Sequence, residues 1–266
     1  MHNKKIAFFD IDGTITSEID GSIPESTIEA IRKSKKNGNL MFINTGRCFQ
    51  NLEERFKEIG FDGYVCGCGT NIYYNDKELL HISQTQKITL KILEQARKTN
   101  VDILFESKTG VAPDLTRPII NEEARVLIDA FKKMNYQLEF DFDLGKYICD
   151  KFVIWFENDN QLKEFRNVSD LYFECIDRGR YFREFVPIGY SKATGIQYLL
   201  DYFEMNLNDV YVFGDSNNDL SMIKYAPNSI AMGNYESDLL LKYVSYVTEK
   251  ASNNGIKQAL EHFGFY

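Results

Sequence analysis

The stretch KKIAFFDIDGTIT (residues 4–16) joins a short apolar run to two closely spaced carboxylates. Ile6 to Phe9 predict a buried strand, and Asp10 and Asp12 follow it with one residue between them. Holding two like charges this close is unfavourable unless a cation or a shared proton offsets the repulsion. The stretch therefore indicates a functional site at the end of a strand.

Strand-like and helix-like segments alternate at both ends of the chain. The predicted strands are residues 5–9, 40–44, 63–66, 210–213, 229–232 and 244–247. The predicted helices are residues 24–37, 49–59, 191–203, 219–225 and 255–263, with another after 232. Such alternation is typical of an α/β fold, in which helices cover both faces of a parallel sheet.

The middle of the chain has a different pattern. Helices are predicted at residues 87–99 and 121–134, and strands at 101–105, 151–156, 171–175 and 181–186. Several of these strands alternate apolar and polar residues, as in an open antiparallel sheet. We therefore expect a parallel-sheet core of residues 1–83 and 189–266, interrupted by an inserted α+β domain of residues 84–188.

The charge and cysteine content exclude several functional classes. The formal net charge of −8 leaves no basic surplus for neutralising nucleic-acid phosphates, although one positive pocket would suffice for a small anionic substrate. No apolar run approaches the ~20 residues that span a bilayer, and no secretory signal is expected. The five cysteines are an odd, sparse set without zinc-site spacing, so we expect buried thiols and a cytoplasmic location.

Further polar residues follow predicted strands or begin predicted helices. Asp215 follows the apolar residues 210–213 as Asp10 follows 6–9, and the segment GDSNND (214–219) contains it. Thr45-Gly46-Arg47 follows the second strand, and Lys192 begins a helix. Ligands of open α/β sheets bind at the carboxyl ends of the strands. Two acidic strand ends there form a hard oxygen site that suits Mg²⁺.

This arrangement is suited to phosphoryl transfer. Asp10 can attack phosphorus to form an aspartyl phosphate, if a magnesium ion held by Asp10 and Asp215 neutralises the charge. Asp12 can protonate the leaving alcohol and later accept a proton from water. The available donors to the phosphoryl oxygens are Thr45, Gly46, Lys192 and Asn218. Each piece alone is more often a turn, a helix cap or a surface lysine, and the order of the pieces along the chain favours the site.

Four of these segments resemble the motifs of the haloacid dehalogenase-like superfamily: FDIDGT, NTGR, GYSKATG and VFGDSNND. The likeness is closest to the Cof-type sugar-phosphate phosphatases, whose large α+β (C2B-type) cap lies between the second and third motifs. The resemblance implies a Rossmann-like core, a Mg²⁺ cofactor, Asp10 as nucleophile and Asp12 as general acid/base. It also implies phosphate contacts from Thr45, Lys192 and Asn218. Gly46 and Arg47, beside Thr45, are further candidate phosphate- or substrate-binding residues. The implied metal ligands are Asp10, Asp215 and the backbone carbonyl of Asp12, with Asp219 as a supporting carboxylate.

The chain departs from the family pattern at two places. After the third strand it has CGCGTN, so that Cys68 stands where the family usually has an asparagine. The lysine motif is SKATG rather than the commoner Ser-Lys-Gly, which we expect to leave the chemistry unchanged.

The expected function is a magnesium-dependent phosphatase of small phosphorylated metabolites such as sugar phosphates. A phosphomutase on the same core and a non-catalytic phosphometabolite-binding regulator are the alternatives. Partners are expected to be small metabolites rather than nucleic acid or membrane, and the sequence predicts no oligomeric state. Arg178, Arg180 and Arg183 form either an exposed hairpin or a site for a second anionic group of the substrate.

Overall fold

The computed structural model describes residues 4–108, 110–133 and 147–266. The chain divides into two units. The first contains the N-terminal segment up to Gly46, Leu52–Leu80 and Ser191–Tyr266, and the second contains Arg47–Asn51 and His81–Tyr190. Within the described residues, no helix is both long and apolar enough to cross a membrane.

An eight-stranded sheet forms the centre of the first unit. Its order is β13-β12-β11-β1-β2-β3-β4-β5. The strands are β1 (Ile6–Phe9), β2 (Leu40–Asn44), β3 (Gly63–Cys66), β4 (Asn71–Tyr74), β5 (Lys77–His81), β11 (Val210–Gly214), β12 (Asn228–Ala231) and β13 (Tyr246–Val247). From β13 to β3 all neighbours are parallel, and Phe9 of β1 lies opposite both Phe213 and Ile43. The chain thus crosses from β1 to β2 in one direction and from β11 to β12 in the other.

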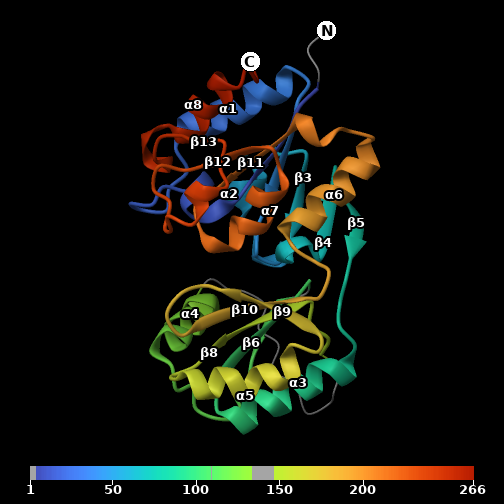
Figure 1. The fold of residues 1–266 in the computed structure, drawn as a ribbon, viewed down its shortest axis with the longest axis vertical. Helices are drawn as coiled ribbons and strands as arrows, with labels where there is room; N and C mark the ends of the chain where they lie inside the picture. The colour runs from blue at the N-terminus through green and yellow to red at the C-terminus, as the bar shows by residue number, and fades with distance from the viewer. Residues whose placement is uncertain (1–3, 109, 134–146) are drawn as a thin grey trace. The chain divides into compact units, whose positions relative to one another are not determined.

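Helices cover both faces of this sheet (Figure 1). The helices are α1 (Glu25–Lys36), α2 (Glu54–Lys57), α6 (Lys192–Phe203), α7 (Leu220–Tyr225) and α8 (Gly255–His262). Right-handed crossovers that run in opposite directions place their helices on opposite faces. Accordingly, Ile196 of α6 and Met222 of α7 belong to one hydrophobic cluster with Phe8 of β1. Helices α1 and α8 contact each other and lie outside this cluster. The expected α/β fold class is confirmed.

Three predictions for the first unit differ from the structure. The helix expected at 49–59 is a 3₁₀ turn at Phe49–Asn51 followed by the four-residue α2, because Cys48, just before the turn, packs with Leu104 and Trp155. The helix expected after β12 is only a 3₁₀ turn at Leu240–Lys242. At its start, the backbone N–H of Leu240 donates to the Ser237 carbonyl, and that of Leu239 donates to Ser237 Oγ. The strands β4 and β5 were not predicted. Their signal is Asn75-Asp76, whose positive φ angles of 47° and 61° suit a two-residue hairpin turn.

Among the residues that the structure describes, the second unit is built on a five-stranded antiparallel sheet. Its order is β7-β6-β8-β10-β9, and all four neighbouring pairs are antiparallel, as the sequence predicts. The strands are β6 (Asp102–Ser107), β7 (Gly110–Pro113), β8 (Lys151–Trp155), β9 (Phe173–Asp177) and β10 (Phe182–Pro187). Helices α3 (Gln86–Thr99) and α5 (Asp159–Ser169) lie side by side (Figure 1) and pack on Phe152. Helix α4 (Glu122–Lys133) packs on Val153, on the other face.

The sequence prediction for this unit missed β7 and α5. Helix α5 begins with a capping box, in which Asn158 and Gln161 each bond the other's backbone N–H. That pairing is visible in the sequence ENDNQ and could have located the helix. Met134, the predicted end of α4, lies outside the described residues.

Candidate active site

The two acidic strand ends of the sequence prediction lie on neighbouring strands of the first unit. Asp10 directly follows β1, and its backbone N–H donates to the Phe213 carbonyl of β11 at 3.0 Å. Asp215 directly follows β11. Because β1 and β11 are parallel and in register, both carboxylates lie at the carboxyl edge of the sheet, and both residues are 4 % exposed.

Lys192 links Asp10 to a third carboxylate. It is the first residue of α6, whose N-terminus is fixed by a capping box between Ser191 and Thr194. Its side chain is fully buried, and Nζ lies 2.6 Å from both Asp10 Oδ1 and Asp219 Oδ1. The ammonium therefore bridges the predicted nucleophile and the predicted supporting carboxylate.

The segment after β11 is folded around Asp219. Asp219 Oδ2 accepts from the backbone N–H groups of Asp215 and Ser216, at 2.9 and 3.1 Å. A Cβ at Gly214 would lie 2.5 Å from Asp219 Cγ, so only glycine leaves room for this carboxylate. Asp219 thereby holds the backbone of Asp215 with one oxygen and Lys192 with the other.

The turn after β1 holds Asp215 from the opposite side. Thr14 Oγ1 donates to Asp215 Oδ1 at 3.1 Å. Gly13 has φ of +74°, and a Cβ there would lie 2.3 Å from Asp215 Oδ2. Its carbonyl accepts from Asn234 Nδ2 at 2.7 Å. Thr14 and Asn234 were not predicted from the sequence as site residues, because their partners are distant in the chain.

The electrostatics of the site are dominated by buried negative charge. Burial, together with the nearby Asp219 and Asp12, raises the pKa of Asp10 to about 7, although Lys192 opposes this shift. Burial, followed by Asp219 and Asp10, raises the pKa of Asp215 to about 9. Burial disfavours the charge of Lys192, but Asp10 and Asp219 outweigh it and raise its pKa. The site thus contains three buried carboxyl groups, two of which contact the Lys192 ammonium.

This donor set fits a hard divalent cation. One oxygen each from Asp10, Asp215 and Asp219 can be chosen so that all three lie within 4.8 Å of one another. Oxygen ligands are those that Mg²⁺ prefers, and the three carboxyl groups lie together beside the Lys192 ammonium. Because both Asp219 oxygens already accept hydrogen bonds, Asp10 and Asp215 are the better candidates for direct ligands.

The other predicted catalytic carboxylate is placed differently. Asp12 lies in the turn after β1 and is exposed, and its charge contributes to the raised pKa of Asp10. The Asp12 carboxyl group is therefore exposed, yet near enough to Asp10 to act on it electrostatically.

The predicted phosphate-binding residues are only partly brought together. Thr45 is buried after β2, and its carbonyl accepts from the Cys68 N–H at 3.0 Å. Asn218 is buried in the turn that carries Asp219, where its Oδ1 accepts from Ser216 Oγ at 2.6 Å. Gly46 follows Thr45 in the first unit, whereas Arg47 groups with the second. Cys68 is buried near Lys192 and contributes to its raised pKa.

Two arginines of the β9–β10 hairpin lie beside carboxylates of the second unit. Arg183 Nη1 lies 3.0 Å from Asp177 Oδ1, and Arg178 Nε lies 4.0 Å from Glu184 Oε2. The Arg180 side chain is 88 % exposed. Arg180 is thus exposed, whereas the Arg178 and Arg183 side chains are 28 % and 15 % exposed and lie beside carboxylates of the same hairpin.

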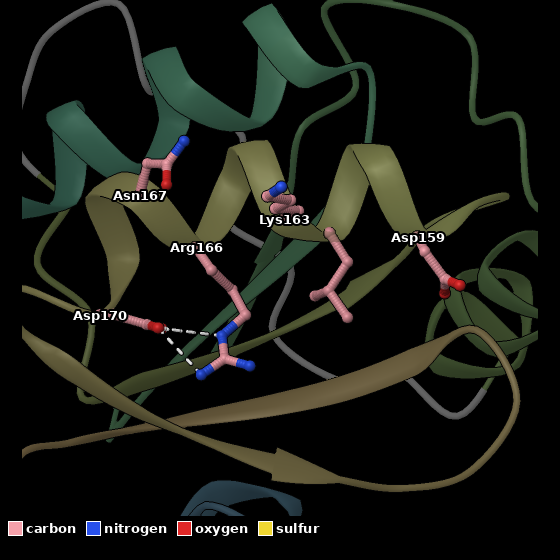
Figure 2. A pocket seen from close by; sticks show the side chains of 6 residues that line it. Asp159, Lys163, Arg166, Asn167 and Asp170 are labelled. Carbon is pink, nitrogen blue, oxygen red and sulfur yellow. Dashed lines mark hydrogen bonds and ion pairs between the residues drawn. The ribbon is translucent and has the colours of Figure 1, made fainter.

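A surface pocket on α5 does not offer a phosphate site. It is lined by Asp159, Leu162, Lys163, Arg166, Asn167 and Asp170. Figure 2 shows Arg166 turned toward Asp170, whose carboxylate its Nε and Nη2 contact at 2.9 Å. The acidic and basic groups balance, so the lining has no positive excess to attract a phosphate.

The chain is similar to known hydrolases over nearly its whole length. A family model described as haloacid dehalogenase-like hydrolase matches residues 7–260. The "Putative phosphatase YkrA" of Bacillus subtilis (strain 168) is 26% identical over 264 residues, which are 98% of each chain. The 5-amino-6-(5-phospho-D-ribitylamino)uracil phosphatase YitU of the same organism is 24% identical, over 96% of this chain and 95% of YitU.

Solved structures agree with the fold. BT1666 from Bacteroides thetaiotaomicron, described among phosphatases of the haloalkanoate (HAD) enzyme superfamily, superposes with a TM-score of 0.83. It is 23% identical, and the match covers 100% of this chain and 97% of BT1666. The family model and these relatives indicate a phosphomonoester hydrolase, as the sequence predicts.

Proposed function

The chain belongs to the haloacid dehalogenase-like hydrolase family, and from this premise we propose that it is a magnesium-dependent phosphatase of small phosphorylated metabolites. The observation that carries the proposal is the buried contact of Lys192 with Asp10 and Asp219, beside Asp215. A binding protein would need positive charge for a phosphate, but not a buried carboxylate held by a lysine at the same point.

In the first proposed step, the Asp10 carboxylate attacks phosphorus. A bond forms between an Asp10 oxygen and phosphorus, and the bond from phosphorus to the leaving oxygen breaks. Asp12, protonated at this stage, gives its proton to that oxygen, so the product leaves as an alcohol. Lys192 fixes the Asp10 carboxylate by its 2.6 Å contact with Oδ1.

In the second step, water hydrolyses the aspartyl phosphate. Asp12, now ionised, takes a proton from the water as its oxygen bonds to phosphorus. The bond between Asp10 and phosphorus breaks, which regenerates the carboxylate and releases inorganic phosphate. Thr45, Gly46, Lys192 and Asn218 are the proposed donors to the phosphoryl oxygens.

The proposed ligands of Mg²⁺ are Asp10, Asp215 and the backbone carbonyl of Asp12, with Asp219 supporting Asp215. When bound, the ion would supply the positive charge that an anionic nucleophile needs in order to approach an anionic phosphate. The excess of carboxylates over ammonium at the site supports this part of the proposal.

The proposed substrates are sugar phosphates or related phosphomonoesters. YitU is named for a ribityl-linked phosphomonoester, which supports this class. We propose that residues 84–188 form a cap that selects the leaving group and that Arg47 contributes to substrate binding. None of the five cysteines, all of which the structure describes, is in a disulfide, which supports a reducing, cytoplasmic location.

Turnover of a panel of phosphorylated metabolites, with Mg²⁺ and with chelator, tests the proposed function. We expect release of inorganic phosphate from several panel members, and none with chelator. Transfer of the phosphate to another position of the same sugar, without release, would instead identify a phosphomutase. Binding without either reaction would identify a regulator.

A further inference from the structure

Asn44 is a buried polar residue that has no role in the proposed mechanism. It is the last residue of β2, directly before Thr45, and its side chain is fully buried. A buried amide that keeps an unpaired polar atom destabilises the folded state. Its contacts should therefore explain what the amide provides there.

The Asn44 amide makes its contacts through its nitrogen. Nδ2 donates to the backbone carbonyl of Lys192 at 3.0 Å and lies 3.6 Å from Met222 Sδ, a weak acceptor. Oδ1 has no hydrogen-bond partner among the described residues. A leucine of similar size would avoid the unpaired oxygen, but it would lose the bond to Lys192. The amide thus provides one specific hydrogen bond, to the Lys192 carbonyl, and leaves its own oxygen buried without a partner among the described residues.

The hydrogen bond from Asn44 ends on the first turn of α6. This turn is also in close contact with β3 and the loop after it. A Cβ at Gly69 would lie 2.2 Å from the Ser191 carbonyl oxygen, and one at Gly195 would lie 2.4 Å from Val65 Cγ1. The loop after β3 therefore packs directly on the backbone around Lys192. Asn44 adds a directional contact from β2, and a carbonyl oxygen has two lone pairs to accept it.

We propose that Asn44 is a positioning residue: its bond to the Lys192 carbonyl fixes the first turn of α6, and thereby the Lys192 ammonium between Asp10 and Asp219. The inference rests on the proposed function, because it assigns Asn44 to the alignment of the proposed nucleophile. A misplacement of about 1 Å in such a site can lower the rate about a hundredfold.

The test compares Asn44→Leu with Asn39→Leu. Asn39 is a matched control, because it is a buried asparagine at the other end of β2. Its Nδ2 donates to the Phe265 and Ser34 carbonyls, away from α6. The measurements are kcat and KM for p-nitrophenyl phosphate, the thermal midpoint, and the ¹⁵N NMR signal of Lys192 Nζ, assigned with Lys192→Met.

We expect Asn44→Leu to lower kcat by about tenfold to a hundredfold and to shift the Lys192 signal. The control, Asn39→Leu, should lower the thermal midpoint and leave kcat and the Lys192 signal unchanged. A kcat within about twofold of wild type and an unshifted signal in Asn44→Leu would overturn the proposal, as would an equal kcat loss in Asn39→Leu. If Asn44→Leu does not fold, Asn44→Val, a residue favoured in strands, takes its place with the same expected results. A wild-type protein inactive on every phosphate ester would refute the proposed function alone, and the NMR signal would then decide the role of Asn44.

Discussion

Replacing Gly13 with alanine should disable the metal site by contact alone. The added Cβ would lie 2.3 Å from Asp215 Oδ2 and 2.8 Å from Cγ, so the carboxylate would have to move by about 1 Å to restore ordinary contact. That movement also stretches the 3.1 Å bond from Thr14 to Asp215. Because Mg²⁺ demands ligands at about 2.0–2.1 Å in near-octahedral geometry, we expect its affinity to fall at least about tenfold.

The backbone strain of this substitution needs its own control. Gly13 has φ of +74°, and alanine in that region costs about 1–2 kcal/mol. Gly21 has φ of +69°, and a Cβ added there would meet no atom within 4 Å, so Gly21→Ala carries similar strain without the contact. Both variants should show the loss of stability from backbone strain in chelator, Gly13→Ala should lose more because of its contact with Asp215, and only Gly13→Ala should lose magnesium affinity.

Calorimetric titration of the metal-free proteins with Mg²⁺ measures the difference. If Gly13→Ala does not fold, Thr14→Val removes the hydroxyl bond to Asp215 with little change in shape, and we expect a few-fold loss of affinity. Unchanged magnesium affinity in Gly13→Ala would refute the placement of the metal beside Asp215.

Four further variants test other parts of the account. Asp10→Asn should reduce turnover of an aryl phosphate by several powers of ten with an unchanged circular-dichroism spectrum, and activity within tenfold of wild type would contradict its role. Asp215→Ala should weaken magnesium binding and activity together; unchanged affinity by calorimetry would place the metal elsewhere. Asp12→Ala should slow aspartyl-phosphate formation less with an aryl phosphate than with a sugar phosphate, because a good leaving group needs little protonation. Acid-quench trapping measures this, and equal losses with the two substrates would exclude Asp12 as the leaving-group acid. Lys151→Met removes the ammonium that lies 2.6 Å from Glu106 and 2.8 Å from Glu184. Denaturant unfolding of the second unit should then show a free energy of unfolding lower by about 3–5 kcal/mol. A decrease under about 1 kcal/mol would contradict a stabilising role for these buried ion pairs.

The parts of the site that follow from local sequence were predictable. An apolar run that ends in a carboxylate identified Asp10 and Asp215 as strand ends, and the structure has β1 and β11 there. The serine before Lys192 suits a helix N-cap, which locates the lysine at the start of α6. These features depend on residues within a few positions of one another, so a pattern in the sequence can show them.

The remaining parts depend on partners far along the chain. Thr14 bonds Asp215 across 201 residues, and Asn44 bonds Lys192 across 148. Nothing near Thr14 or Asn44 in the sequence indicates those partners, because strand order alone brings them together. The same reason explains the helix wrongly predicted at 49–59, since the packing of Cys48 with Leu104 and Trp155 in the second unit is not visible locally.

Trapping the phosphorylated enzyme shows whether the phosphoryl group is transferred to Asp10. The Asp12→Ala variant, incubated with p-nitrophenyl phosphate and Mg²⁺ and quenched in acid, should accumulate the intermediate because its hydrolysis is slowed. Mass spectrometry of the digested protein should then locate one phosphoryl group on the peptide that contains Asp10, and none after Asp10→Asn is added. A phosphoryl group on another residue, or release of phosphate with no labelled peptide at any quench time, would exclude Asp10 as the nucleophile.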